Sequence, residues 1–198
     1  VRNYPFKPIT QSLTLRNAVW PYGGNVDEPY SVALNDAINP DIKGICFRPS
    51  NLTINVFNPS TLKAKFNQGF GIAGPAQFGS MSTQACNQGG RESDFAFATS
   101  NSTDRKAAMD FLDNQVKDGE YVVVRSIILE SLGYTLANEW KADENIFGAG
   151  NSIYHKLRNA GFTDIDSFNR LRCFVFIYKK NDPSFTPQFR FSNSFNDF

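Results

Sequence analysis

The sequence is poor in histidine, in net charge and in long apolar runs, and each shortage excludes a class of function. Its 198 residues contain one His, so a single chain cannot assemble a zinc site with two His ligands. Lys and Arg number 20 against 19 Asp and Glu, without the basic surplus of nucleic-acid-binding domains. The longest apolar run, residues 173–178, is far shorter than the ~20 residues of a membrane-spanning helix. We therefore expect no metal, no cofactor, no nucleic-acid partner and no membrane span.

Cysteine is equally sparse, with only Cys46, Cys86 and Cys173. Because three is an odd number, at most one intrachain disulfide can form, and the spacing does not say which pair would form it. Buried structural thiols are the common outcome. The alternative is a nucleophile at Cys86, whose Ala-Cys-Asn-Gln-Gly-Gly surroundings are similar to the nucleophile turn of gingipain-type cysteine peptidases. A thiolate needs a base, and that family places its His upstream, whereas His155 lies downstream in a predicted helix.

The start of the chain suggests a piece of a longer protein. It opens at Val1 rather than Met, and the first residues contain no apolar stretch typical of a secretory signal. We expect a fragment or a processed product, so the missing signal does not argue against secretion.

The first hundred residues indicate short strands joined by turns, because they combine aromatic residues with many Asn, Ser, Pro and Gly. Alternating polar and apolar residues predict strands over 12–16, 31–34, 52–57 and 94–98. In the third of these, Leu52, Ile54 and Val56 share one face. The opposite face then carries Thr53, Asn55 and Phe57.

The rest of the chain adds helices. Apolar spacing predicts helices over residues 102–117, 135–142 and 152–160, with Ser102 or Thr103 capping the first and Asn151 the third. A near-continuous apolar run over 120–128 predicts a strand covered on both faces. The strongest strand is predicted over 173–178, and a short strand is expected at Ile165. The tail, residues 184–198, is predicted to be an edge strand or a linker.

Aromatic rings beside polar side chains are the remaining functional signal. Sugar recognition combines flat apolar surfaces, which cover C–H faces, with amides and charged groups that bind hydroxyls. The binding-site hypothesis therefore takes Arg125, Tyr134, Asn138 and Trp140 as ligand-binding residues. The competing interpretation places the Trp rings in the core.

Residues 52–180 resemble the interleukin-like EMT inducer domain. The matching pieces are, in order, residues 54–59 (INVFNP), 97–99 (FAT), 118–124 (DGEYVVV), and 157–163 with the closing strand 174–177. The resemblance is to a bacterial branch found in large secreted Bacteroidetes proteins, including sortase-like proteins of type IX secretion. Two departures are Ala98, where the family has an acid, and Ile128–Ser131, where it has an acidic turn.

The resemblance implies an α+β fold, with two small antiparallel or mixed β-sheets and two to three helices packed outside. It divides the chain into an N-terminal β-rich segment (1–50), the main domain (51–183) and the tail (184–198). It also implies a secreted or cell-surface location. Together with the residues, it indicates a non-catalytic module of a larger exported protein, with a glycan as the favoured partner. A structural or docking role toward another domain of the same protein is the alternative.

Overall fold

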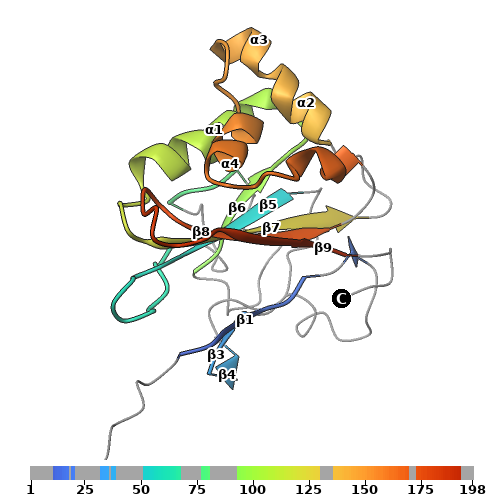
Figure 1. Ribbon diagram of the computed structural model, residues 1–198. Helices are drawn as coiled ribbons and strands as arrows, with labels where there is room; N and C mark the ends of the chain where they lie inside the picture. The colour runs from blue at the N-terminus through green and yellow to red at the C-terminus, as the bar shows by residue number, and fades with distance from the viewer. Residues whose placement is uncertain are drawn as a thin grey trace, which may run out of the picture.

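The computed structural model describes two β-sheets and a layer of helices (Figure 1). The described residues are 11–17, 19–20, 32–35, 37–38, 51–67, 77–80, 93–129, 136–169 and 173–192.

The larger sheet has six strands in the described part of the chain. Its order is β6 (Phe95–Ala98), β5 (Asn51–Phe57), β7 (Tyr121–Leu129), β8 (Phe174–Lys179) and β9 (Gln188–Phe191), all antiparallel. The sixth strand, β2 (Val19–Trp20), pairs in parallel with the end of β7, beyond the part of β7 that pairs with β8. The main sheet thus takes strands from all three segments of the chain, and residues 188–191 are an edge strand.

The smaller sheet has three antiparallel strands, β1 (Leu13–Leu15), β3 (Val32–Leu34) and β4 (Ala37–Ile38). It lies across the main sheet from the helices (Figure 1). Val32 packs there with Phe57 and Val123 of the main sheet. The strands predicted over 12–16 and 31–34 are confirmed.

Helices cover the other face of the main sheet (Figure 1). In chain order they are α1 (Ser102–Asn114), α2 (Ala137–Ala142), α3 (Glu144–Phe147), α4 (Ile153–Asn159) and a 3₁₀ helix (Ile165–Asn169). Two sheets with helices packed outside confirm the predicted α+β class. None of the described helices combines the length and the apolar character needed to cross a bilayer.

The central strands are buried on both faces because a layer covers each side. All seven residues of β5 are buried, and Val122, Val123 and Val124 of β7 are fully buried. Leu52, Ile54 and Val56 contribute to the core under the helices, whereas Phe57 lies in the cluster under the small sheet. The predicted division of β5 into two faces is confirmed.

Two helix caps differ from the prediction by one residue. Asn101 caps α1, where its Oδ1 accepts from the backbone N–H of Asp104 at 2.9 Å. Ser152, not Asn151, caps α4. Asn151 instead donates its side-chain amide to the carbonyl of Phe147. Asn and Ser both serve well as caps, so the local sequence does not separate neighbouring candidates.

The strand expected at Ile165 is wrong, since this residue begins the 3₁₀ helix. Asp164 favours the turn because its backbone carbonyl accepts from the N–H of Ser167 at 3.0 Å. Its carboxylate also accepts from the Ser167 hydroxyl at 2.7 Å. Ile165 itself is fully buried, so its apolar character reflects the core and not a pleated strand.

Lys180 joins the end of β8 to the end of α1. Its Nζ donates to the backbone carbonyls of Leu112, Asp113 and Val116 at 2.7, 2.9 and 2.8 Å. These carbonyls belong to the last turn of α1 and the residues that follow it, where an ammonium group also opposes the negative end of the helix dipole.

Lys180→Met should therefore lower the free energy of unfolding by about 1–3 kcal/mol, because three carbonyls lose a charged donor. The measurement is urea denaturation followed by circular dichroism. Lys117 is an exposed cation that directly follows Val116, one of the residues whose carbonyls accept from Lys180. Lys117→Met should change the free energy of unfolding by less than about 0.5 kcal/mol. Equal effects of the two substitutions would contradict the capping role.

Tyr178 makes the fold sensitive to alkaline pH. Burial raises the pKa of its phenol well above the ordinary value of 10.0, and the nearby charge of Asp113 adds to the shift. The unfolded chain releases this proton near pH 10 while the folded chain keeps it, so stability should fall as the pH rises above about 10. Tyr178→Phe should flatten this alkaline decline, which urea denaturation between pH 8 and 11 would measure. An unchanged slope would show that other groups cause it.

Candidate functional site

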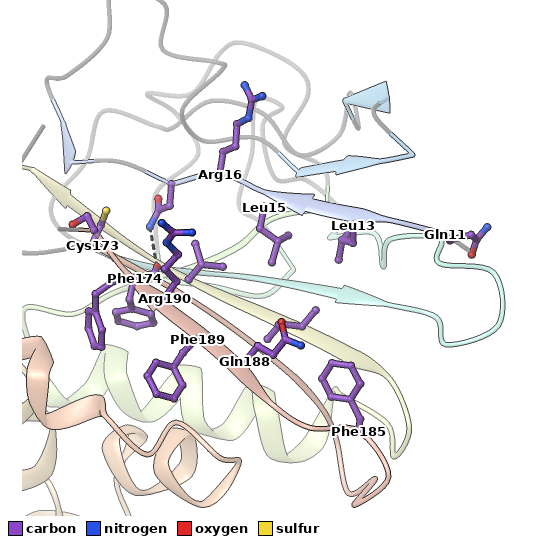
Figure 2. A pocket seen from close by; sticks show the side chains of 15 residues that line it. Gln11, Leu13, Leu15, Arg16, Cys173, Phe174, Phe185, Gln188, Phe189 and Arg190 are labelled. Carbon is purple, nitrogen blue, oxygen red and sulfur yellow. Dashed lines mark hydrogen bonds between the residues drawn. The ribbon is translucent and has the colours of Figure 1, made fainter. Parts of the chain in front are cut away.

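A groove of about 750 Å³ lies on the face of the main sheet opposite the helices (Figure 2). One side is the β1 segment, with Leu13, Leu15 and Asn17, and the base is formed by β8 and β9. The groove runs along β8 from Cys173 and Phe174 at one end toward Phe185 at the other (Figure 2). A second hollow, of about 730 Å³, is lined by residues of α1, α4 and the end of β8.

Strand alternation decides which side chains of β8 and β9 line the base. Phe189 and Phe191 of β9 pack against the core under the helices. Gln188 and Arg190 therefore point to the groove side, because successive side chains of a strand alternate between faces. In register, Arg190 lies opposite Val175 and Gln188 opposite Ile177. The base thus combines two half-buried aliphatic side chains with a guanidinium and an amide.

Asn17 fixes the β1 side of the groove against the main sheet. Its Nδ2 donates to the carbonyl of Ser126 on β7 at 2.7 Å and to that of Phe174 on β8 at 2.9 Å. The Ser126 hydroxyl accepts from the Phe174 N–H at 2.8 Å, just where the backbone pairing of β7 and β8 ends. The chain that follows β1 is therefore held against the main sheet by one buried side-chain amide.

Two polar atoms of the groove lining have no hydrogen-bond partner within the described part of the protein. They are Oδ1 of Asn17, whose side chain is 5% exposed, and Oγ of Ser192. Ser192 is held at this end of the groove because its N–H donates to the carbonyl of Cys173. A buried polar atom without a partner costs about 1–3 kcal/mol, so both atoms favour a bound polar group.

Arg125, a predicted ligand-binding residue, is a buried structural cation. It is 1% exposed, and its guanidinium lies 3.4 Å from Oδ1 of Asp94 and donates to Oδ1 of Asn55 at 3.0 Å. Asn55 in turn donates to Asp94 at 2.6 Å. Burial lowers the pKa of Arg125, and the charge of Asp94 partly opposes that shift. Arg125 therefore holds the sheet together where it cannot reach solvent.

The other predicted site residues do not gather around Arg125. Trp140 is 1% exposed in the core under the helices, with its ring centroid 4.9 Å from that of Phe168. Arg125 lies on β7 on the opposite face of the main sheet. Asn138 is exposed on α2, and Tyr134 lies outside the described residues. The structure thus does not bring Arg125 and Trp140 into one site, and the Trp140 ring offers no surface for a sugar.

The structure describes two of the residues considered for cysteine chemistry, Cys173 and His155. Cys173 is buried, whereas Cys86 and Cys46 lie outside the described residues. Nδ1 of His155 lies 2.8 Å from the Ser152 hydroxyl, and its Nε2 lies 3.6 Å from a carboxylate oxygen of Glu144. Among the described residues, no three His, Cys, Asp or Glu side chains gather as a metal site requires.

Sequence reasoning missed the groove residues. Gln188-Phe189-Arg190-Phe191 alternates polar and aromatic residues, which is the signal of a strand with one polar face. That pattern alone identifies Arg190 and Gln188 as a pair on one side. Nothing in the sequence brings Asn17 to them, because Asn17 and Phe174 are 157 positions apart.

No protein-family model matches this sequence, and no curated protein matches it significantly. The functional argument therefore rests on the geometry of the groove.

Replacing Arg125 tests its structural role. Arg125→Met should lower the free energy of unfolding by about 3–5 kcal/mol, because it leaves the Asp94 carboxylate buried without its cation. Urea denaturation at pH 7 is the measurement. The double variant Arg125→Met with Asp94→Leu should be more stable than the single variant. A loss below about 1 kcal/mol in the single variant would contradict this assignment.

Proposed function

We propose that this chain is a non-catalytic binding module that holds a carbohydrate in the groove between β1 and β8–β9. The observation that carries the proposal is the pair of polar atoms without partners, Asn17 Oδ1 and Ser192 Oγ, at one end of that groove. A sugar hydroxyl both donates and accepts hydrogen bonds, so one saccharide can supply a donor to Asn17 and a partner to Ser192.

The apolar part of the groove supports the same ligand. Val175 and Ile177 are half-buried on its base, and the half-buried ring of Phe185 stands at the far end (Figure 2). Such surfaces suit the C–H faces of a pyranose ring, while the amide of Gln188 suits its hydroxyls. These residues take the place of Trp140, on which the sequence-based hypothesis depended.

The side chains of the groove favour binding over catalysis. Among the described residues that line it, the polar side chains are amides, guanidiniums, the hydroxyl of Ser192 and the buried thiol of Cys173, and none is His, Asp, Glu or Lys. Acyl, glycosyl and proton transfer use a positioned nucleophile or acid–base group. Membership of the interleukin-like EMT inducer family and export within a larger secreted or cell-surface protein remain proposals that rest on the sequence motifs.

A docking role toward another domain is the second candidate. The observation that favours it is β9, the outermost strand of the described sheet on that side. Strands at a sheet edge carry backbone groups that can pair with an added strand. An extended segment paired with β9 would lie beside the groove.

Ser192→Ala separates ligand binding from folding. The substitution removes a buried hydroxyl that has no described partner, so the free energy of unfolding should stay within about 0.5 kcal/mol or rise. Affinity for a saccharide identified on a glycan array should fall about 5- to 10-fold, which corresponds to one lost hydrogen bond.

Ser167→Ala is the matched control, since this hydroxyl lies in the 3₁₀ helix and donates to Asp164. It should leave saccharide affinity unchanged. Absence of binding to every saccharide on the array, or equal affinity of wild type and Ser192→Ala, would contradict the proposal and turn attention to docking at β9.

A further inference from the structure

We infer that the saccharide bound in the groove is acidic, with a uronic-acid carboxylate held by Arg190 and a neighbouring hydroxyl held by Asn17. The inference rests on the proposed function, because it names the class of saccharide for the same groove.

Unlike Arg105, Arg125 and Arg158, Arg190 has no carboxylate partner among the described residues. Arg105 forms a buried pair with Asp143, Arg125 pairs with Asp94, and Arg158 pairs with Asp166. Arg190 has no ion pair or hydrogen bond within the described part of the chain, and no Asp or Glu is among the described residues that line the groove. The guanidinium is thus a cation available to an anionic ligand.

The difference between a paired arginine and one without a described partner is clearest along one row of the sheet. Arg125 on β7, Val175 on β8 and Arg190 on β9 lie side by side in register. The protein supplies Asp94 to the inner arginine, whereas the outer arginine faces the groove. Arg190 projects from β9 toward the β1 segment, while Arg16 points away from the main sheet (Figure 2). The positive charge on the base of the groove is therefore that of Arg190.

Arg190 and the two polar atoms without described partners lie at the same end of the groove. Ser192 follows Arg190 by two positions and stays in register, since its N–H donates to the carbonyl of Cys173. Asn17 is held beside them because its Nδ2 donates to the carbonyl of the next residue, Phe174. The site thus offers a bidentate cation, a buried acceptor and a hydroxyl within one end of the groove.

This combination selects among anions. A carboxylate matches the planar fork of a guanidinium, and Asn17 Oδ1 requires a hydrogen-bond donor. A uronic acid carries both groups, a carboxylate on the ring and a hydroxyl on the adjacent carbon. Free sulfate would satisfy Arg190 but offers no donor to Asn17, and a neutral sugar would satisfy Asn17 but leave Arg190 without an anion.

The test compares acidic trisaccharides with their neutral counterparts. The probes are trimers of galacturonate, glucuronate and mannuronate, each beside its methyl ester, which keeps the hydroxyls and removes the charge. Isothermal titration calorimetry with the wild-type chain should give at least ~10-fold tighter binding to one or more of the acids than to the matched ester, because a charged hydrogen bond is lost in the ester.

Three variants show which residues cause the preference for the acid over the ester. Arg190→Gln should abolish the preference for acid over ester, because the uncharged amide of Gln does not distinguish the carboxylate by its charge. Ser192→Ala should weaken acid and ester by the same factor. Arg158→Gln makes the same chemical change on α4, where Arg158 pairs with Asp166, and should leave both affinities unchanged. The urea-unfolding midpoint of each variant confirms that it is folded.

The outcomes distinguish this inference from the proposed function. Equal binding of acid and ester by the wild type, or a preference that survives Arg190→Gln, would overturn the acidic-ligand inference and leave saccharide binding standing. No binding to any of the acids or esters, with binding to other neutral saccharides, would also overturn it alone. No binding to any saccharide would overturn both.

Discussion

The two-sided burial of β5 and β7 is the constraint on which the rest of the structure depends. A strand that is apolar on both faces cannot border water, so each face must be covered by another layer. The helices cover one face through Leu52, Ile54 and Val124. The small sheet covers the other, where Val32 meets Phe57 and Val123. On that face β8 and β9 form the base of the groove, and the β1 segment lies along one side of it.

Polar groups on the groove side of the main sheet divide into those that hold the fold and those that face a ligand. Asn55, Asp94 and Arg125 form a buried network in which each has a partner. Arg190 continues the row of Arg125 outward across β8 and lines the groove. The same residue type thus stabilises the sheet at one position and presents a charge at another, and the available carboxylate decides between them.

Local pattern predicted most of the fold but little of the site. The two faces of β5, the strand at 120–128 and the three helices follow from apolar spacing, because burial acts on every residue of an element. Ile165 shows the limit, since one apolar residue between polar ones fits a turn as well as a strand. Trp140 and Arg125 attracted attention as an aromatic ring and a cation near loops, yet burial of both decides against them. Burial depends on partners far along the chain, such as Asp94 for Arg125, which spacing does not reveal.

The groove is assembled from segments that lie far apart in the sequence. Asn17 contributes one side and Phe174 the base, and their contact joins positions 157 residues apart. A nascent chain leaving the ribosome therefore displays Asn17 long before the strand that will receive it. Each of the helices α1 and α4 forms through local hydrogen bonds and can form early, whereas closing the long loop between Asn17 and Phe174 is expected to be slow. The surface that we assign to the ligand is thus completed only after nearly all of the described polypeptide has been synthesised.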